Sequence, residues 1–254
     1  MSGHSKWKTI KRKKGATDAK RGQVFTKIAR EISIVAREGG GDPRDNFRLR
    51  LVVEKARQAN MPKDNIERAI KRGTGELKGE VLEEVMYEGY APNGIALLLS
   101  TLTDNRNRAV SDIRRILSRH GGKMAQVGSV SYLFDQQGYV NVEVSDDVDP
   151  EELALLAIDE GATDVNVDDS TVEIYTRVED FQKVKEALEN TDTSISAAEL
   201  IMTPKSMTEL TEEETFKVMR IIEMLEQLDD VQQVYSNLYL SPELVLKYEE
   251  MQAA

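Results

Sequence analysis

The sequence contains no cysteine and only two histidines, His4 and His120, among its 254 residues. The absence of cysteine excludes disulfides, thiolate catalysis and cysteine-ligated zinc, and it is typical of a reducing compartment. Neither histidine forms a recognisable pair with another ligand at metal spacing. The sequence therefore predicts no catalytic residue, no metal site and no cofactor.

Long apolar runs are also missing. No window approaches the ~18 consecutive apolar residues of a membrane span, and residues 1–15 contain no apolar stretch suited to a signal sequence. We therefore expect a cytoplasmic protein with no membrane contact. With 40% hydrophobic residues the chain can bury a sizeable core, and its length favours two or three domains.

Charge is distributed unevenly along the chain. The formal net charge is −11, but residues 1–75 hold twenty Lys and Arg against eight Asp and Glu, a charge of +12. Residues 76–254 hold fourteen basic and 37 acidic side chains, a charge of −23. Since only one end of the chain attracts polyanions, nucleic acid is the expected partner of the amino-terminal region.

The basic arm, residues 1–22, is the most specific functional feature, and Asp18 is its only acidic residue. Cations near a nucleic-acid backbone displace condensed counterions, so such a cluster favours phosphate binding, whereas a solvated tail is the structural alternative. The arm is expected to be mobile, and base specificity does not follow from it. Its candidate binding residues are Lys6, Lys8, Lys11, Arg12, Lys13, Lys14, Lys20 and Arg21.

Trp7 is the only tryptophan and lies between Lys6 and Lys8. Its ring has the right position to stack on an unpaired base while its neighbours hold phosphate. Docking of the ring on the helical domain is the alternative, because lone aromatics often anchor a chain to an apolar surface.

Arg106 and Arg108 form a second candidate contact. They lie at the start of an expected helix, where the helix dipole disfavours cations. A bound phosphate would resolve this conflict, and so would an ion pair with Asp104 or Asp112. The sequence leaves both explanations open.

Hydrophobic spacing predicts three helices in the basic region. The first runs from Val24 to the glycines at 39–41, the second from Pro43 or Asp45 to before Asn60, and the third from Pro62 to Gly73. Phe47, Leu51, Val52 and Ala56 of the second helix are expected to face the core. Together the arm and the helices form a small basic domain over residues 1–76.

The remaining sequence mixes strands and helices. Residues 81–90 and 94–103 read as a hairpin, 107–119 as a helix and 129–134 as a strand. Residues 138–203 follow the strand–helix–strand–strand–helix–strand order of a ferredoxin-like unit. A helix at 212–228 and a strand at 231–240 have no neighbours in sequence, so we expect them to return to the first mixed domain.

These patterns predict an α+β protein of three domains, a basic helical one followed by two mixed ferredoxin-like ones. The middle domain is discontinuous and comprises residues 77–135 and 208–254, while the inserted third domain comprises residues 136–207. No active site assembles from the remaining motifs. The pairs Asp146–Asp147, Asp168–Asp169 and Asp229–Asp230 are typical of solvated or capping groups, and Gly73-Thr74-Gly75 is no phosphate-binding Walker loop.

Several long motifs, in order along nearly the whole chain, closely resemble the YebC family. They are GHSKW at 3–7, DAKRGQVFTKIAREI at 18–32, NMPKDNIERAIKRGTGE at 60–76, YEGYAPNGIALLL at 87–99, LTDNRNRAV at 102–110, HGGKM at 120–124, GSVSYLF at 128–134 and LDDVQQVYSN at 228–237. Departures from the family pattern are small: Ala91-Pro92-Asn93-Gly94 stands where glycines are usual, and Phe47 replaces a common proline. Neither departure touches the basic candidate residues.

The resemblance implies three domains, the last inserted into the middle one, and no enzymatic activity. Bacterial members of the family are commonly described as DNA-binding transcriptional regulators. The related mitochondrial translational activator of cytochrome oxidase implies action on ribosomes instead. The expected function is a regulator that binds DNA, with a translation factor that binds ribosomal or transfer RNA as the alternative; neither reading involves a small-molecule substrate.

Two further hypotheses come from other classes of protein. A metal-dependent nuclease would need a convergent set of carboxylates, which the sequence does not show. A protein-binding scaffold would use the basic arm to meet an acidic partner, and its complexes would survive nuclease treatment.

Overall fold

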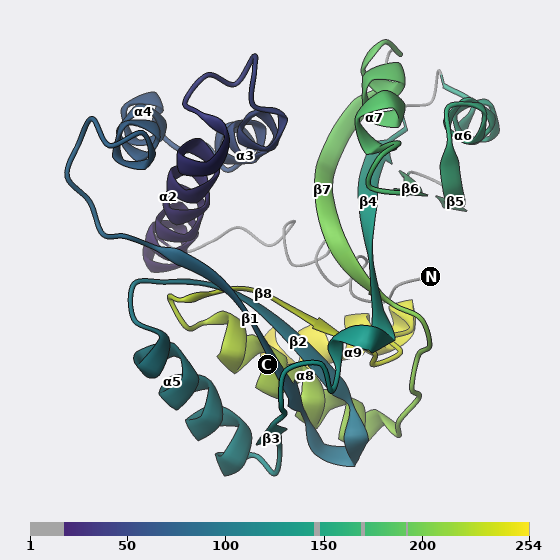
Figure 1. Ribbon diagram of the computed structural model, residues 1–254. Helices are drawn as coiled ribbons and strands as arrows, with labels where there is room; N and C mark the ends of the chain where they lie inside the picture. Colours follow the sequence, from purple (N-terminus) through teal and green to yellow (C-terminus); the bar gives the residue numbers. More distant parts are fainter. Residues whose placement is uncertain (1–17, 145–147, 169–170, 192, 254) are drawn as a thin grey trace. The chain divides into compact units, whose positions relative to one another are not determined.

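The computed structural model describes residues 18–144, 148–168, 171–191 and 193–253 (Figure 1). The chain divides into two compact units: Phe134–Thr203 is one, and the sequence before and after it forms the other. The basic helices and the middle sheet thus belong to one unit. The expected division into three domains stays a prediction, whereas the mixed α+β class is confirmed.

Three helices form the basic region: α2 (Asp18–Gly39), α3 (Phe47–Gln58) and α4 (Lys63–Gly73). Their apolar faces meet in one core, in which Ile32, Leu49 and Ala56 are completely buried. The helix α2 begins six residues before the predicted start at Val24, so residues 18–22 belong to a helix and not to the arm. The other two helices begin and end close to the predicted bounds.

The turn before α3 explains one wrong prediction about the core. Asn46 is buried and caps α3, accepting from the backbone N–H of Leu49, while its amide donates to the carbonyls of Val35 and Gly40. The capped start turns Leu49 and Val53 inward. Phe47, expected in the core, is instead half-buried, with the Arg50 guanidinium 5.8 Å above its ring.

The middle sheet contains β1 (Glu83–Tyr90), β2 (Ala96–Thr103), β3 (Lys123–Met124) and β8 (Val231–Ser236) in the order β3-β1-β2-β8. The neighbouring strands are antiparallel, and β1 and β2 form the expected hairpin around a turn at Pro92–Gly94. Pairing of β8 with β2 confirms that the last strand returns to this sheet. The helices α5 (Arg106–Arg119) and α8 (Glu212–Glu226) pack against it (Figure 1).

The strand predicted at residues 129–134 is wrong. Residues Ser131–Leu133 form a 3₁₀ turn instead, because the buried carboxylate of Glu88 accepts the backbone N–H groups of Gly128, Val130 and Ser131. A side chain thus satisfies the groups that a neighbouring strand would otherwise bond. The strand that follows α5 is instead the short β3, which pairs with β1.

A helix at the end of the chain was not predicted. The helix α9 (Pro242–Ala253) buries Val245 and Tyr248 against α8, where the Tyr248 ring lies 5.4 Å from that of Phe216. Its apolar positions are too few for a clear periodic pattern. Packing against a preformed helix therefore decides its structure more than its own sequence does.

The unit Phe134–Thr203 has the predicted ferredoxin-like element order. Its elements are β4 (Phe134–Glu143), α6 (Pro150–Asp159), β5 (Ala162–Asp168), β6 (Thr171–Thr176), α7 (Phe181–Glu189) and β7 (Ser194–Pro204). The strand order is β5-β6-β4-β7, with β6 antiparallel to both neighbours. Val140, Ile174 and Leu188 are completely buried, which places this unit's own core between its sheet and helices.

Candidate nucleic-acid interface

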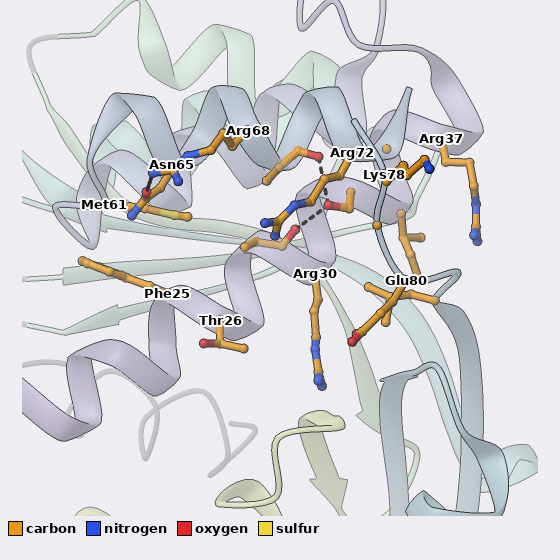
Figure 2. A pocket seen from close by; sticks show the side chains of 17 residues that line it. Phe25, Thr26, Arg30, Arg37, Met61, Asn65, Arg68, Arg72, Lys78 and Glu80 are labelled. Atoms are coloured by element: carbon orange, nitrogen blue, oxygen red, sulfur yellow. Dashed lines mark hydrogen bonds between the residues drawn. The ribbon is translucent and has the colours of Figure 1, made fainter. Parts of the chain in front are cut away.

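A cavity of about 540 Å³ lies between α2, α4 and the segment that leads into β1. We call it the basic groove (Figure 2). Five of the side chains that line the groove are basic, and Glu80 is the one carboxylate among the lining residues. The five cations, which come from three separate stretches of the chain, are Arg30, Arg37, Arg68, Arg72 and Lys78.

Close packing of two helices forms the floor of the groove. The Ser33 hydroxyl bonds to the carbonyls of Ala29 and Ala69, both at 2.9 Å, and so links α2 to α4. A Cβ atom on Gly73 would lie 2.3 Å from the Ser33 carbonyl oxygen, closer than any real Cβ contact. Glycine at this position allows α2 and α4 to pack closely. The long basic side chains of the two helices then line the cavity above the contact.

Four of the five cations of the groove form no ion pair with a described residue. One of them, Arg68, donates to the Asn65 side-chain oxygen and the Asp64 carbonyl. Arg37, Arg72 and Lys78 are exposed, and none forms a salt bridge with any residue that the structure describes. The aliphatic stem of Arg72 lies close to Gly79, where an added Cβ would be 3.4 Å from it. The groove thus collects positive charge that the surrounding protein does not neutralise.

Several basic side chains elsewhere in the helical region are paired with carboxylates. Lys55 lies 2.8 Å from Glu31, and Arg48 lies 2.8 Å from Glu38. Arg44 donates to the Asp42 carboxylate at 2.6 Å, and this hydrogen bond lowers the pKa of Asp42 to about 2. The groove differs from these faces, because most of its cations form no salt bridge with a described residue.

Arg30 has a different role from its neighbours in the groove. Its guanidinium donates to the Asp229 carbonyl at 2.7 Å and to the Asp230 carboxylate at 3.0 Å. Lys27 and Gln23, one and two turns earlier in α2, donate to the carbonyls of Glu226 and Gln227 at the end of α8. These contacts fasten α2 to the turn between α8 and β8, so Arg30 fixes the position of one groove wall.

Most of the predicted arm residues lie outside the described part of the chain. This applies to Lys6, Trp7, Lys8, Lys11, Arg12, Lys13 and Lys14, and to His4. Lys20 lies within α2, but its side chain is not described, and Arg21 is exposed in the second turn of that helix. Their role in binding stays a prediction.

Arg106 and Arg108 are placed at the start of α5, and both form ion pairs. Arg106 bonds to the Glu83 carboxylate, and the Arg108 Nη2 lies 2.8 Å from Asp230 and 2.6 Å from Asp104. Hydrogen bonds to Asp230 and then Asp104 raise the pKa of Arg108. Asp104 is thus one of the partners that the sequence suggested, whereas Asp112 pairs with Arg115.

The surroundings of Arg108 also disfavour an anion. A second cavity of about 530 Å³ is lined by Arg108 and Arg30 together with five carboxylates. A phosphate entering it would meet like charge from Glu80, Asp104, Asp112, Asp229 and Asp230. Ligand contact by Arg106 and Arg108 stays a prediction, and ion pairing accounts for both residues.

Other candidates for chemistry have structural surroundings. His120 lies at the carboxyl end of α5, directly after the helix that the sequence predicts at 107–119. Asp230 pairs with two arginines, and Asp146 and Asp147 lie outside the described residues. Within the described part of the chain, no three His, Asp or Glu side chains gather where a metal ion could bind.

Sequence reasoning missed the groove residues Arg37, Arg68, Arg72 and Lys78. The helix bounds contain a signal that would have found two of them: Arg68 and Arg72 are four residues apart and therefore share one face of α4. Lys78 lies in an irregular segment, and no pattern in the sequence places that segment beside α2.

Among the described helices, none is long and apolar enough to cross a membrane.

The fold and the groove define an α+β protein whose positive charge is concentrated in an amino-terminal helical region. Residues 5–76 match the model of the TACO1/YebC protein N-terminal domain, and residues 82–238 match that of the TACO1/YebC second and third domain. The chain belongs to the TACO1/YebC family. The resemblance found in the sequence is thereby confirmed.

Curated relatives and a solved structure support the same placement. A probable transcriptional regulatory protein of Dehalococcoides mccartyi (strain CBDB1) is 50% identical over 98% of both chains. One of Herpetosiphon aurantiacus is 52% identical over 98% of this chain and 99% of the relative. The crystal structure of a conserved hypothetical protein from Aquifex aeolicus matches with a TM-score of 0.80 and 46% identity, covering 88% of this chain and 92% of that one. At the level of the family, the names indicate a regulator.

Proposed function

We propose that this protein is a non-enzymatic, nucleic-acid-binding regulator of gene expression that binds through the basic groove and the basic arm. The observation that carries the proposal is the set of three unpaired cations, Arg37, Arg72 and Lys78, around one cavity. A phosphate backbone would supply the negative charge that these side chains lack, with release of counterions. DNA is the proposed target, because the relatives are named transcriptional regulatory proteins.

The groove is suited to holding a backbone more than to reading a sequence. Arginine and lysine contacts to phosphate fix the register of a protein on nucleic acid but carry no base information. Selectivity among DNA sites would then come from additional groove contacts or from sequence-dependent DNA shape. Binding should consequently depend strongly on salt and weakly on sequence.

A translation factor that binds ribosomal or transfer RNA is the second candidate. It is favoured by the position of the cations between two packed helices, because a DNA-reading helix usually projects into the major groove. Structured RNA offers loops and bulges whose backbone can enter such a site. The ribosome would then be a partner, and the acidic remainder of the chain would stay away from RNA.

The test is crosslinking of the protein to nucleic acid in living cells, with sequencing of the attached DNA and RNA. The groove variant carries Arg37→Gln, Arg72→Gln and Lys78→Gln. A matched control carries Arg57→Gln, Lys63→Gln and Lys71→Gln, which removes three exposed cations of the same region that do not line the groove. An arm variant neutralises Lys11, Arg12, Lys13 and Lys14 together.

Groove-dependent enrichment at promoter DNA would support the transcriptional role, and enrichment on ribosomal or transfer RNA would support the translational one. Equal crosslinking by the wild type, the groove variant and the control would contradict the proposed site. The non-enzymatic part is tested separately with purified protein, DNA or RNA, and magnesium. Turnover that disappears when the acidic pairs are substituted would overturn it.

A further inference from the structure

We infer that the basic groove takes an unpaired strand of nucleic acid, with a base against Phe25 and phosphates against Arg72 and Lys78. The inference rests on the proposed function, because it names the form of nucleic acid that the same groove prefers. It follows from the unequal chemistry of the two ends of the groove. Both ends are drawn in Figure 2.

One end is apolar and aromatic. Phe25 and Met61 lie together there, with Asn65 beside them (Figure 2). Phe25 is half-buried, so part of its ring packs on the helical core and part remains available. Every nucleobase has a flat π face that can stack on such a ring. This end therefore has the chemistry of a base platform.

Asn65 adds a polar group to the same end. Its side-chain oxygen accepts from the Arg68 Nη2 at 2.8 Å, which fixes the orientation of the amide. The amide nitrogen, a donor of two hydrogen bonds, remains for a base edge or a sugar. Arg68 thereby acts as a positioning residue for Asn65 while its own charge stays at the groove.

The other end is cationic. Arg37 and Lys78 lie there, and Arg72 stands between them and the Phe25 end (Figure 2). These cations come from α2, α4 and the segment before β1, so they surround the groove on several sides. A thin, flexible backbone can be enclosed in this way, whereas a rigid duplex would touch only the outer rim.

The combination of both ends favours an unpaired strand over a duplex. In a duplex the base faces are stacked on each other, so a ring beside the backbone finds no face to contact unless a base is pulled out of the stack at a cost. An unpaired strand exposes its bases and its phosphates at once. Aromatic platforms beside cationic grooves are the usual means of binding such strands without sequence preference.

Binding of the full chain to short labelled nucleic acids tests the inference. The probes are an unstructured single strand of DNA, the same sequence in RNA, and the DNA duplex, each followed by fluorescence anisotropy at several salt concentrations. We expect at least one single strand to bind more tightly than the duplex. The comparison of DNA with RNA separates the two sources of unpaired strand.

Phe25→Ala should weaken single-strand binding roughly 5- to 100-fold and leave the slope of log affinity against log salt unchanged, because stacking releases no counterions. Arg72→Gln should lower that slope by about 0.7 on single strands, and Lys71→Gln, its neighbour outside the groove, should leave it unchanged. Phe25→Tyr should keep wild-type affinity. These readouts separate a base platform from loss of folding.

A spectroscopic measurement covers the case in which Phe25→Ala unfolds. In the double variant Trp7→Phe, Phe25→Trp, the single tryptophan lies at the apolar end of the groove. Its fluorescence should be quenched by the single strand and much less by the duplex. Equal or tighter duplex binding without quenching would overturn the inference, and absence of any nucleic-acid binding by the wild type would overturn the proposed function instead.

Discussion

Two groups of arginines and lysines in this protein have the same charges and opposite surroundings. Around the basic groove, Arg37, Arg72 and Lys78 have no acidic partner among the described residues. At the start of α5, Arg106 and Arg108 are held by Glu83, Asp104 and Asp230. The carboxylates nearby, and not the basic residues themselves, distinguish the two places.

This difference shows why charge in a sequence is a weak guide to a binding site. A paired arginine must break its ion pair before it can meet a phosphate, while an unpaired one loses only water and counterions. Arg108 of α5 and Arg30 of α2 also link both helices to the α8–β8 turn through Asp230.

The largest effect is expected from the groove itself. The variant with Arg37→Gln, Arg72→Gln and Lys78→Gln should bind DNA about 100-fold more weakly near physiological salt, with a salt slope lower by about 2 to 3. Arg106→Gln with Arg108→Gln should change neither quantity, because those cations are already paired. Anisotropy titrations across a salt series measure both. A larger loss of affinity from the Arg106→Gln, Arg108→Gln variant than from the groove variant would contradict this expectation.

Removal of the carboxylate that Arg30 and Arg108 share should have the next largest effect. The Asp230 side chain is 8% exposed and meets both Arg30 and Arg108. Asp230→Asn should lower the free energy of unfolding by about 3 kcal/mol, because it leaves Arg30 without a carboxylate and Arg108 with Asp104 alone in a partly buried place. Urea denaturation measures this. Asp112→Asn, which breaks an exposed pair, should cost less than about 1 kcal/mol.

Two glycines of the helical region differ in the space around them. Gly73→Ala should destabilise the protein by about 2 kcal/mol, since its Cβ would meet the Ser33 carbonyl at 2.3 Å and force α2 and α4 apart. Gly22→Ala has open space around it in the same helical region and should stabilise by up to about 1 kcal/mol. Thermal unfolding of both variants gives the sign of each change in stability. A change in the same direction for both would contradict the close packing of α2 against α4.

The smallest effect concerns the buried carboxylate of the middle sheet. Burial alone would raise the pKa of Glu88, but backbone N–H groups of Gly128, Val130 and Ser131 outweigh it and lower the pKa. A lowered pKa adds stability that is present above the ordinary pKa of the carboxyl and is lost as the pH falls through the lowered value. The stability advantage of the wild type over Glu88→Gln, about 1 kcal/mol at neutral pH, should therefore shrink in acid. Denaturation at pH 7 and about pH 3 compares the two.

Much of the fold was predictable from local patterns. The stops at Gly39 and Gly73, the ferredoxin-like order of the inserted unit and the helix over Pro150–Asp159 follow from periodicity and capping residues. The 3₁₀ turn at Ser131–Leu133, where a strand was predicted, was not predictable, because a carboxylate distant in sequence, Glu88, accepts from its backbone N–H groups. The helix α9 was missed for a similar reason, since its burial depends on contacts with α8.

The uneven charge, the helices of the basic region and the membership of the family could all be recognised from the order of the residues. These properties depend on residue type and short spacing, which a linear pattern retains. Which cations form ion pairs with carboxylates, and which line a cavity without such a partner, depends on the tertiary structure. That choice depends on residues such as Arg108 and Asp230, 122 positions apart, which only the packing of α5 beside the α8–β8 turn brings together.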